Sequence, residues 1–420
     1  MKEVAKRRKR SFDSVYMARD IAYIVPADNF TLMKQESLFY DKITKIGQGT
    51  FGEVFKSRAK ITNEVVAMKK ILMENEKEGF PITALREINM LKKLRHRNVT
   101  LLVDICSSSG KQDKGRTSFY LVFTFCEHDL AGILKSQTGK KMTPVVIKTM
   151  LYHLFEGLAY IHSCKVLHRD MKTANILVSK DGVLKLADFG LARLMINTSD
   201  PDGKCYTNRV VTMWYRPPEL LFGERCYSEE IDVWGAGCIM AEFWTKTPIL
   251  QGTTELNQLD LIVKLCGTIN AATMRRCETL PNFKNFPNLG NHPRKVLSLL
   301  SPFEDDPAAV NLIDRLLALE PLDRLTAVQA LKHEYFQIAP LPQEHVGDFI
   351  RTLSGSLFEY TVNQGFNNQR PGGGGGAHRP PPGLPGHIGG GGGNHHHHHQ
   401  RRPNGPPRNI PNQQVYDRIF

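Results

Sequence analysis

The chain has 420 residues, of which 41% are hydrophobic and 23% charged. This length suits one large domain with tails, or about two to three ordinary domains. No apolar run reaches the roughly 18 residues that a membrane helix needs, and no apolar signal region follows the basic N-terminus, so we expect a soluble, intracellular protein without a membrane partner. The formal charge of +13 favours acidic or phosphorylated partners, although net charge bears on association and not on fold.

The eight cysteines are scattered along the chain, and no two of them form a C-x-x-C pair. Disulfide-rich domains and zinc sites both show characteristic cysteine spacings. The pattern therefore argues against a disulfide framework and against a zinc site, and it is typical of a protein from a reducing compartment.

Composition divides the chain into three segments. Residues 1–39 form a basic extension that contains the block Lys6–Arg10, and residues 40–337 have the composition of a globular domain. Residues 338–420 become rich in glycine, proline and histidine. Such a segment has too little apolar surface to offset its ordering entropy, so we expect a disordered tail.

The first motif with a chemical meaning is IGQGTFGEVF at 46–55, followed by VVAMKK at 65–70. Glycines at G-x-G-x-x-G spacing let a hairpin lie close over phosphates, because side chains there would collide with them. Alone, the cluster is weak evidence, since most glycine clusters are only turns. Lys69 strengthens it, because a lysine in an apolar strand is costly unless an anion meets it. Nucleotide phosphates and Glu87 are the two candidate anions.

Residues 81–94 predict a helix of about four turns that begins at Pro81, whose fixed φ suits a first helical turn. Apolar residues recur three positions apart and give the helix one apolar stripe. Arg86 and Glu87 are neighbours inside this pattern and point about 100° apart, so they must have different partners.

A second constellation consists of VLHRDMKTANILV at 166–178 and LKLADFGLAR at 184–193. Phosphoryl transfer requires a phosphate cover, a lysine on the phosphates, a base and metal ligands in one cleft, and the motifs supply these parts in order. Either half could arise by chance, but a chance occurrence of both halves downstream of Lys69 is improbable. Over residues 40–337 the chain resembles the eukaryotic protein kinases.

This resemblance implies an α+β, bilobal protein-kinase fold. The small β-rich N-lobe, at about 40–123, should carry one regulatory helix, and the large C-lobe, at about 127–337, should be mainly helical. The resemblance also implies an ATP-dependent Ser/Thr kinase whose cofactors are ATP and Mg²⁺.

The resemblance also assigns roles to residues of the catalytic loop. Asp170 is expected to accept the proton of the substrate hydroxyl, Lys172 to lie near the γ-phosphate, and Thr212 to bridge these two. Asn175 and Asp188 are expected to hold magnesium ions, which prefer oxygen ligands. The residues expected around the nucleotide are Ile46, Gly47, Gln48, Gly49, Thr50, Phe51, Gly52, Glu53, Val54, Lys69, Thr124, Phe125, Cys126 and Asp188.

Residues 206–220, YTNRVVTMWYRPPEL, resemble the end of the activation loop in cyclin-dependent and mitogen-activated kinases. Thr207 is the expected phosphorylation site. A phosphate there would bring close to two negative charges to Arg86, Arg169 and Arg193, which would otherwise repel one another. Further residues are expected to hold the C-lobe together: Glu219 paired with Arg324, and Asp232 under the catalytic loop.

The sequence Pro-Ile-Thr-Ala-Leu-Arg-Glu at 81–87 is the helix signature of the transcription-elongation branch of cyclin-dependent kinases, which residues 120–134 and 206–225 also resemble. This resemblance implies a T-type cyclin as partner. It implies as substrates the C-terminal repeats of the large RNA polymerase II subunit and elongation factors. It also implies residence in the nucleus, aided by Lys6–Arg10. Thr124 and the glycine-rich tail depart from the common pattern of this branch.

The helix is expected to respond to the cyclin. Glu87 should point into the cleft toward the strand lysine, Leu85 and Leu91 should pack on the small lobe, and Ile82 and Ile88 should touch the cyclin. In the free kinase we expect the helix to rotate outward and break the lysine–glutamate pair. Cyclin binding then selects the inward state.

Several alternatives stay open at this point. The chain could be another transcriptional or cell-cycle cyclin-dependent kinase. It could be a pseudokinase scaffold, although such proteins normally lose a lysine, aspartate or asparagine of the machinery, and all are present here. It could act as a nuclear scaffold through an RNA- or condensate-prone tail, and direct nucleic-acid binding by the basic tails is unproven.

Overall fold

The structure is a computed structural model that describes residues 34–49, 52–71, 82–109, 117–136, 142–196, 205–286, 289–300 and 306–368. The chain divides into two units, Met1–Gly365 and Phe366–Phe420. Of the second unit, only residues 366–368 are described, and they end the last helix. The predicted basic block and most of the predicted tail therefore lie outside the described residues.

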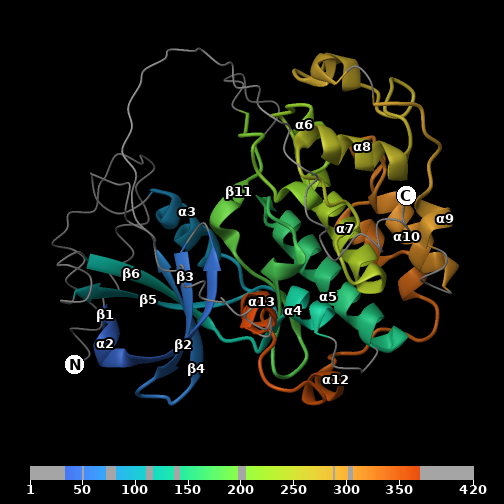
Figure 1. The fold of residues 1–420 in the computed structure, drawn as a ribbon. Helices are drawn as coiled ribbons and strands as arrows, with labels where there is room; N and C mark the ends of the chain where they lie inside the picture. The colour runs from blue at the N-terminus through green and yellow to red at the C-terminus, as the bar shows by residue number, and fades with distance from the viewer. Residues whose placement is uncertain are drawn as a thin grey trace, which may run out of the picture. The chain divides into compact units, whose positions relative to one another are not determined.

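A six-stranded sheet forms the N-terminal part of the first unit (Figure 1), with the strand order β1-β5-β6-β4-β3-β2. Side chains alternate between the two faces of a strand. One face of β4 therefore sends Val66 and Met68 into the core of the sheet, while the other presents Ala67 and Lys69 to a cleft. The strands are β1 Lys34–Gln35, β2 Tyr40–Gly49, β3 Gly52–Ala59, β4 Val65–Ile71, β5 Leu102–Ser109 and β6 Thr117–Thr124.

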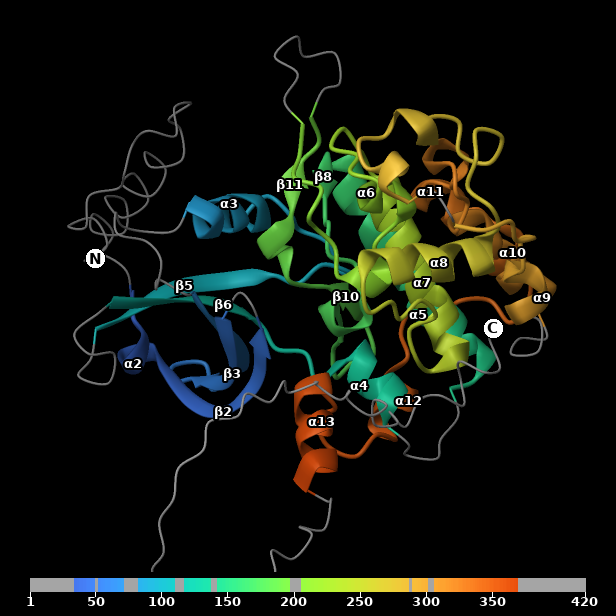
Figure 2. The same ribbon diagram turned by 45° about the horizontal axis from the view of Figure 1, so that its top comes forward.

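Helix α3, Ile82–Leu91, lies beside this sheet and close to the two-residue strand β11, Arg193–Leu194 (Figure 2). Its apolar stripe packs inward, with Ile88 2% and Leu91 1% exposed. Glu87 is also buried, whereas Arg86 is exposed. The two neighbouring charges thus face different surroundings, as the 100° helical step requires.

Helices dominate the rest of the unit. Helix α7 is buried along nearly its whole length and packs against α5 and α10, with Trp234 and Phe243 fully buried. Among the described residues, no helix is long and apolar enough to cross a membrane. The helices are α2 Glu36–Phe39, α4 Leu130–Lys135, α5 Pro144–Ser163, α6 Pro218–Leu221, α7 Glu230–Thr245, α8 Glu255–Cys266, α9 Val296–Leu300, α10 Pro307–Leu316, α11 Ala327–Leu331, α12 Gly347–Arg351 and α13 Glu359–Asn368.

Two small sheets hold the loops that carry the sequence motifs. In one, β9 lies between β10 and β7, and in the other β11 pairs with β8. The loop between β8 and β9 contains the catalytic-loop motif, and the segment between β10 and β11 contains Asp188. The remaining strands are β7 His128–Asp129, β8 Val166–Leu167, β9 Ile176–Val178 and β10 Leu184–Leu186.

Helices and strands extend beyond the predicted domain boundaries at residues 39 and 337. Residues 34–39 form β1 and α2, and β1 pairs with β5. On the other side, residues 338–368 form α12 and α13 and return to the helical part, where Val346 N donates to Gly182 O. The reason is apolar burial: Val346, Ile350 and Phe358 are 3%, 5% and 6% exposed, and the glycine-rich composition starts only after residue 370.

A buried ion pair joins α6 to the segment between α10 and α11. Arg324 donates to both carboxylate oxygens of Glu219, at 2.7 and 2.8 Å, and its guanidinium also lies 4.9 Å from the Trp234 ring. The arginine side chain is 0% exposed and that of Glu219 is 4% exposed. These distances match the pairing expected from the sequence.

We expect Glu219→Ala to lower the free energy of unfolding by about 3–5 kcal/mol, because it leaves the Arg324 charge buried without its partner. Urea unfolding of the full chain measures this change. The matched control is Asp260→Ala, which breaks an exposed pair with Lys264 inside α8 and should change the free energy by less than about 0.5 kcal/mol. Equal effects of the two variants would contradict the prediction.

Candidate active site

A cavity of about 390 Å³ lies between the sheet and the helical part. Its lining includes apolar side chains, among them Ile46, Val54, Ala67 and Leu177. It also includes charged and amide side chains: Lys69, Glu87, Lys172, Asn175 and Asp188. A ligand with both an apolar group and an anionic group would match this lining.

Lys69 is the buried cation of the cavity. Its ammonium lies 2.9 Å from Glu87 Oε1 and 2.8 Å from Asp188 Oδ1. Burial alone would lower the pKa of Lys69, but the carboxylates of Asp188 and Glu87 raise it above its ordinary value. Burial alone would raise the pKa of Asp188, and the neighbouring Lys69 instead holds it below its ordinary value. The lysine is therefore charged and is held between two segments that are far apart in sequence.

Both carboxylate oxygens of Asp170 are occupied by donors. Lys172 Nζ lies 2.7 Å from Oδ2, and the side-chain amide of Asn175 donates to the same oxygen at 2.9 Å. Thr212 donates to Oδ1 through its hydroxyl, at 2.8 Å, and through its backbone N–H, at 3.1 Å. Lys172 also donates to the Thr212 hydroxyl at 3.2 Å. The structure thus brings together the catalytic-loop residues and the threonine expected to bridge them.

Asp232 on α7 holds the backbone of the catalytic loop in place. It accepts hydrogen bonds from the backbone N–H groups of His168 and Arg169, both at 2.8 Å, and contacts His162 Nε2 at 3.0 Å. Arg169 has a φ of +66°, which a non-glycine residue seldom adopts, so the loop needs such support. His168 is fully buried and its Nε2 lies 2.9 Å from Ala187 O, an environment that suits a packing residue and not a base.

Most of the residues expected around the nucleotide line the cavity: Ile46, Gly47, Gln48, Gly52, Val54, Lys69, Thr124, Cys126 and Asp188. Cys126 is 3% exposed, and burial raises the pKa of its thiol to about 12, so it is a lining residue and not a nucleophile. Thr50 and Phe51 lie outside the described residues, and Gly49 is described only as the last residue of β2.

The side chains of two residues expected around the nucleotide do not line the cavity. Glu53 alternates with Gly52 and Val54 along β3, so its side chain leaves the cavity and pairs with Lys45 at 2.6 Å. Phe125 turns away between Thr124 and Cys126, and its ring meets that of Phe358 at 6.2 Å. In both cases the period-2 alternation of extended backbone decides which side chain reaches the cavity.

The sequence analysis missed the contribution of the C-terminal segment. Phe358, Glu359 and Tyr360 line the cavity. Asp129 anchors them, because its carboxylate accepts the backbone N–H of Glu359 at 2.9 Å and also caps α4 through Gly132 N at 2.6 Å. Glu359 pairs in turn with Lys135 at 2.5 Å. Asp129 lies shortly after β6 and could have been suspected, but residues 358–360 carry no motif.

A second cavity, of about 700 Å³, contains the expected regulatory residues Arg86, Arg169, Arg193 and Thr207. Arg169 donates to Leu191 O and to the hydroxyl of Tyr227. Burial lowers the pKa of Arg193, and the positive charges of Arg169 and Arg86 lower it further. Thr207 is exposed at this cluster. Three arginines from different segments therefore converge next to a hydroxyl, which is an arrangement that suits a phosphate.

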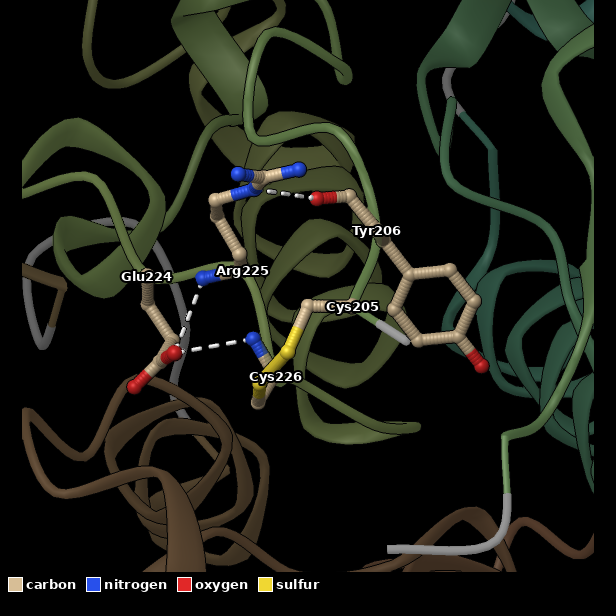
Figure 3. Close-up of a disulfide and its surroundings, with 5 residues drawn as sticks. All are labelled: Cys205, Tyr206, Glu224, Arg225 and Cys226. Atoms are coloured by element: carbon tan, nitrogen blue, oxygen red, sulfur yellow. Dashed lines mark hydrogen bonds between the residues drawn. A yellow bond between two sulfur atoms is a disulfide. The ribbon is translucent and has the colours of Figure 1, made fainter. Parts of the chain in front are cut away.

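The structure differs from the expectation about cysteines. Cys205 and Cys226, 21 residues apart in the chain, form a disulfide (Figure 3). Their spacing in the sequence matches no motif, because the pair is brought together by the fold of the activation loop against the segment after α6.

The expectation for the cyclin-contacting face of α3 is corrected in part. Ile88 packs into the protein's own core at 2% exposed, because it lies on the same helical face as Leu91. It therefore offers no surface to a partner in this conformation. The side chain of Ile82 lies outside the described residues. The structure shows α3 in the inward state with Lys69 and Glu87 paired, and outward rotation in the free kinase stays a prediction.

The donor set of the first cavity fits ATP and a divalent cation. Lys69 and Lys172 provide positive charge for phosphates, and the oxygen atoms of Asn175 and Asp188 are the ligands that hard cations prefer. The strand hairpin above them approaches closely at Gly52, whose φ of +132° is a conformation that other residues rarely adopt.

Residues 40–336 match the protein kinase domain family. The chain belongs to the protein kinase family. Cyclin-dependent kinase 9 of Homo sapiens is 52% identical over 322 residues, which cover 76% of this chain and 86% of that protein. Cyclin-dependent kinase 9 of Danio rerio is 50% identical over 339 residues, covering 79% of this chain and 90% of that protein.

A solved structure shares the fold of this kinase. The crystal structure of the yeast RNA Pol II CTD kinase CTDK-1 complex contains a chain with a TM-score of 0.66 and 35% sequence identity, covering 72% of this kinase and 94% of that chain. The predicted kinase fold, with a β-rich N-lobe and a helical C-lobe, is confirmed. So is the resemblance to cyclin-dependent kinases. The protein is a Ser/Thr kinase that uses ATP and a divalent metal.

Proposed function

We propose that this kinase transfers the γ-phosphate of ATP, with Mg²⁺ as the metal, to Ser or Thr residues that are followed by Pro. The observation that carries the proposal is the network of Asp170, whose two oxygens are oriented by Lys172, Asn175 and Thr212. A carboxylate held in this way can accept a proton from a hydroxyl without first reorganising.

Each charged group of the cavity then has a separate task. Asp170 orients the substrate hydroxyl and takes its proton, while Lys69 and Lys172 hold phosphate oxygens. Asn175 and Asp188 would hold Mg²⁺, which neutralises phosphate charge when it is bound. Glu87 keeps Lys69 in position from α3.

The backbone of the activation loop supports a preference for proline after the acceptor. Val211 has a φ of +67°, which is costly for a β-branched residue. Its carbonyl oxygen accepts two hydrogen bonds from Arg216, at 3.0 and 3.3 Å. This carbonyl is therefore directed to the arginine and not to a bound peptide. Proline has no backbone N–H, so it loses no hydrogen bond at such a position.

We further propose the C-terminal repeats of RNA polymerase II as substrate, elongation factors as additional substrates, a T-type cyclin as partner and a role in transcription elongation. The support is the 52% identity to cyclin-dependent kinase 9 of Homo sapiens and the shared fold with the yeast RNA Pol II CTD kinase. Phosphorylation of Thr207 would add the anion that Arg86, Arg169 and Arg193 surround.

Loss of either catalytic carboxylate should abolish most turnover. We expect Asp170→Asn and Asp188→Asn each to lower kcat by about 10²–10⁴-fold, because the first removes the base and the second a metal ligand. The assay uses the kinase with a T-type cyclin, Mg²⁺-ATP and a peptide with a Ser-Pro site. Asp181→Asn, at an exposed position, is the control and should keep wild-type turnover. Wild-type kcat in either of the first two variants would rule out this mechanism.

The proposed cyclin partner is expected to bind α3 through Ile82. We expect Ile82→Asp to weaken cyclin binding by about tenfold or more, because burial of one large aliphatic side chain contributes roughly 1.5–3 kcal/mol. Titration with a purified T-type cyclin measures the dissociation constant. Asn89→Asp, which places the same charge on an exposed position of α3, should bind normally. A normal dissociation constant for Ile82→Asp, or full activity of the free kinase, would refute the regulatory role of this helix.

We propose that the kinase resides in the nucleus and that Lys6–Arg10 contributes to its import, since short basic runs can serve as import signals. Replacement of the block by alanines should shift a fluorescently tagged protein toward the cytoplasm. Live-cell imaging measures the ratio of nuclear to cytoplasmic signal. An unchanged ratio would show that this block is not the signal.

A further inference from the structure

The Cys205–Cys226 disulfide places a covalent bond directly beside the proposed phosphorylation site. Cys205 precedes Thr207 by two residues, and Cys226 lies between α6 and α7 in the helical part. The Cα atoms of the two cysteines are 5.0 Å apart, a separation at which the backbones allow a disulfide. The bond therefore ties the activation loop to the body of the C-lobe.

Non-covalent contacts surround this bond (Figure 3). Tyr206 N donates to Arg225 O at 2.8 Å, and Arg225 Nε donates to Tyr206 O at 3.1 Å. The rings of Tyr206 and Tyr227 stack at 4.8 Å, and the Tyr227 hydroxyl donates to Thr207 O at 2.7 Å. These contacts hold the two cysteines near each other when the sulfurs are not bonded, so the pair can re-form after reduction.

The pair is also accessible to redox reagents. Cys226 is exposed and Cys205 is half-buried. Cys106, Cys126, Cys238, Cys266 and Cys277 are buried, and burial raises the pKa of the last four thiols. A thiolate is the reactive form of cysteine, so these buried cysteines are poorly suited to exchange. Cys164 is an exposed free cysteine that lines the same cavity as Cys205 and Thr207.

We propose that Cys205 and Cys226 form a reversible redox modification site that takes a small disulfide oxidant, such as oxidised glutathione. One cysteine thiolate attacks the oxidant, forms a mixed disulfide and releases one reduced glutathione. The second cysteine, as a thiolate, attacks the mixed disulfide and releases the other glutathione, so two thiols are oxidised and one disulfide is reduced. Excess reduced thiol reverses both steps.

The oxidised state restricts access to Thr207. An enzyme that adds or removes a phosphate must draw the loop out of the cluster of Arg86, Arg169 and Arg193, and such access depends on local opening of the loop. The disulfide opposes this opening, so oxidation preserves whichever phosphorylation state Thr207 already has. This consequence rests on the proposed role of Thr207, whereas the tethering of the loop does not.

Trypsin cleavage after Arg209 tests the tether itself, because Arg209 is exposed on the tethered loop. The full chain is treated with oxidised glutathione or with a reducing phosphine, exchanged into one buffer and digested, and the cleavage is followed by mass spectrometry. We expect cleavage after Arg209 to be about tenfold slower in the oxidised protein. Cys205→Ser and Cys226→Ser should cleave at the fast rate after both treatments, and Cys164→Ser should behave as the wild type.

Equal cleavage rates in the oxidised and reduced wild type, or an oxidant effect that disappears in Cys164→Ser, would overturn the proposal. The control compares the thermal unfolding temperatures of the reduced variants with that of the reduced wild type. Equal temperatures show that no serine has disturbed the fold.

Release of phosphate from Thr207 tests the consequence. Protein phosphorylated at Thr207 is oxidised or reduced as above and incubated with a Ser/Thr phosphatase, and we expect about tenfold slower release from the oxidised wild type. Equal release rates would overturn the regulatory part. If Thr207 accepts no phosphate from ATP with the cyclin or from a purified activating kinase, the proposed function fails at this site, and the trypsin experiment still decides the tether.

Discussion

The arrangement of the cleft depends on one constraint, which is that the ammonium of Lys69 must have anions around it. An isolated buried charge is too costly to keep, so the strand that carries Lys69 requires Glu87 and Asp188 to approach it. Glu87 lies on α3 and Asp188 follows β10, so one cation joins the sheet, the helix beside it and the segment between β10 and β11. Phosphates of a bound nucleotide add a third source of negative charge. The position of α3 and the net charge around Lys69 therefore depend on each other.

A buried charge with its hydrogen-bond partners also explains why the catalytic loop can keep a strained conformation. The positive φ of Arg169 is tolerable because Asp232, 1% exposed on the largely buried helix α7, accepts hydrogen bonds from two backbone N–H groups of this loop. Burial would raise the pKa of Asp232, but its hydrogen bond and charge interaction with His162 hold the pKa below the ordinary value. The loop is therefore attached to the core through a charged acceptor, and the position of Asp170 follows from the core.

The sequence predicted the parts that depend on side-chain chemistry at a fixed spacing. Lysine, aspartate and asparagine at motif positions have few alternative uses in one cleft, so their meeting could be anticipated. The errors arose where tertiary packing decides. Successive side chains of extended backbone point to opposite faces, and a run of motif residues does not show which of them face the cavity. Glu53 and Phe125 were therefore expected at the cavity although their side chains do not line it. Ile88 faces the core, and the segment around Phe358 lines the cavity from a part of the chain without a motif, which only the folded chain reveals.

Two kinds of interaction that respond to different conditions would hold the activation loop in the proposed phosphorylated state. The attraction between a phosphate on Thr207 and the three arginines would be electrostatic, so salt would screen it. The covalent bond between Cys205 and Cys226 is insensitive to salt and responds to thiol reagents. The charges of the arginines repel one another, so the cluster favours an anion. The hydrogen bonds of Tyr206 and the nearby disulfide keep Thr207 beside the arginines, so the cluster would be in place for the proposed phosphate.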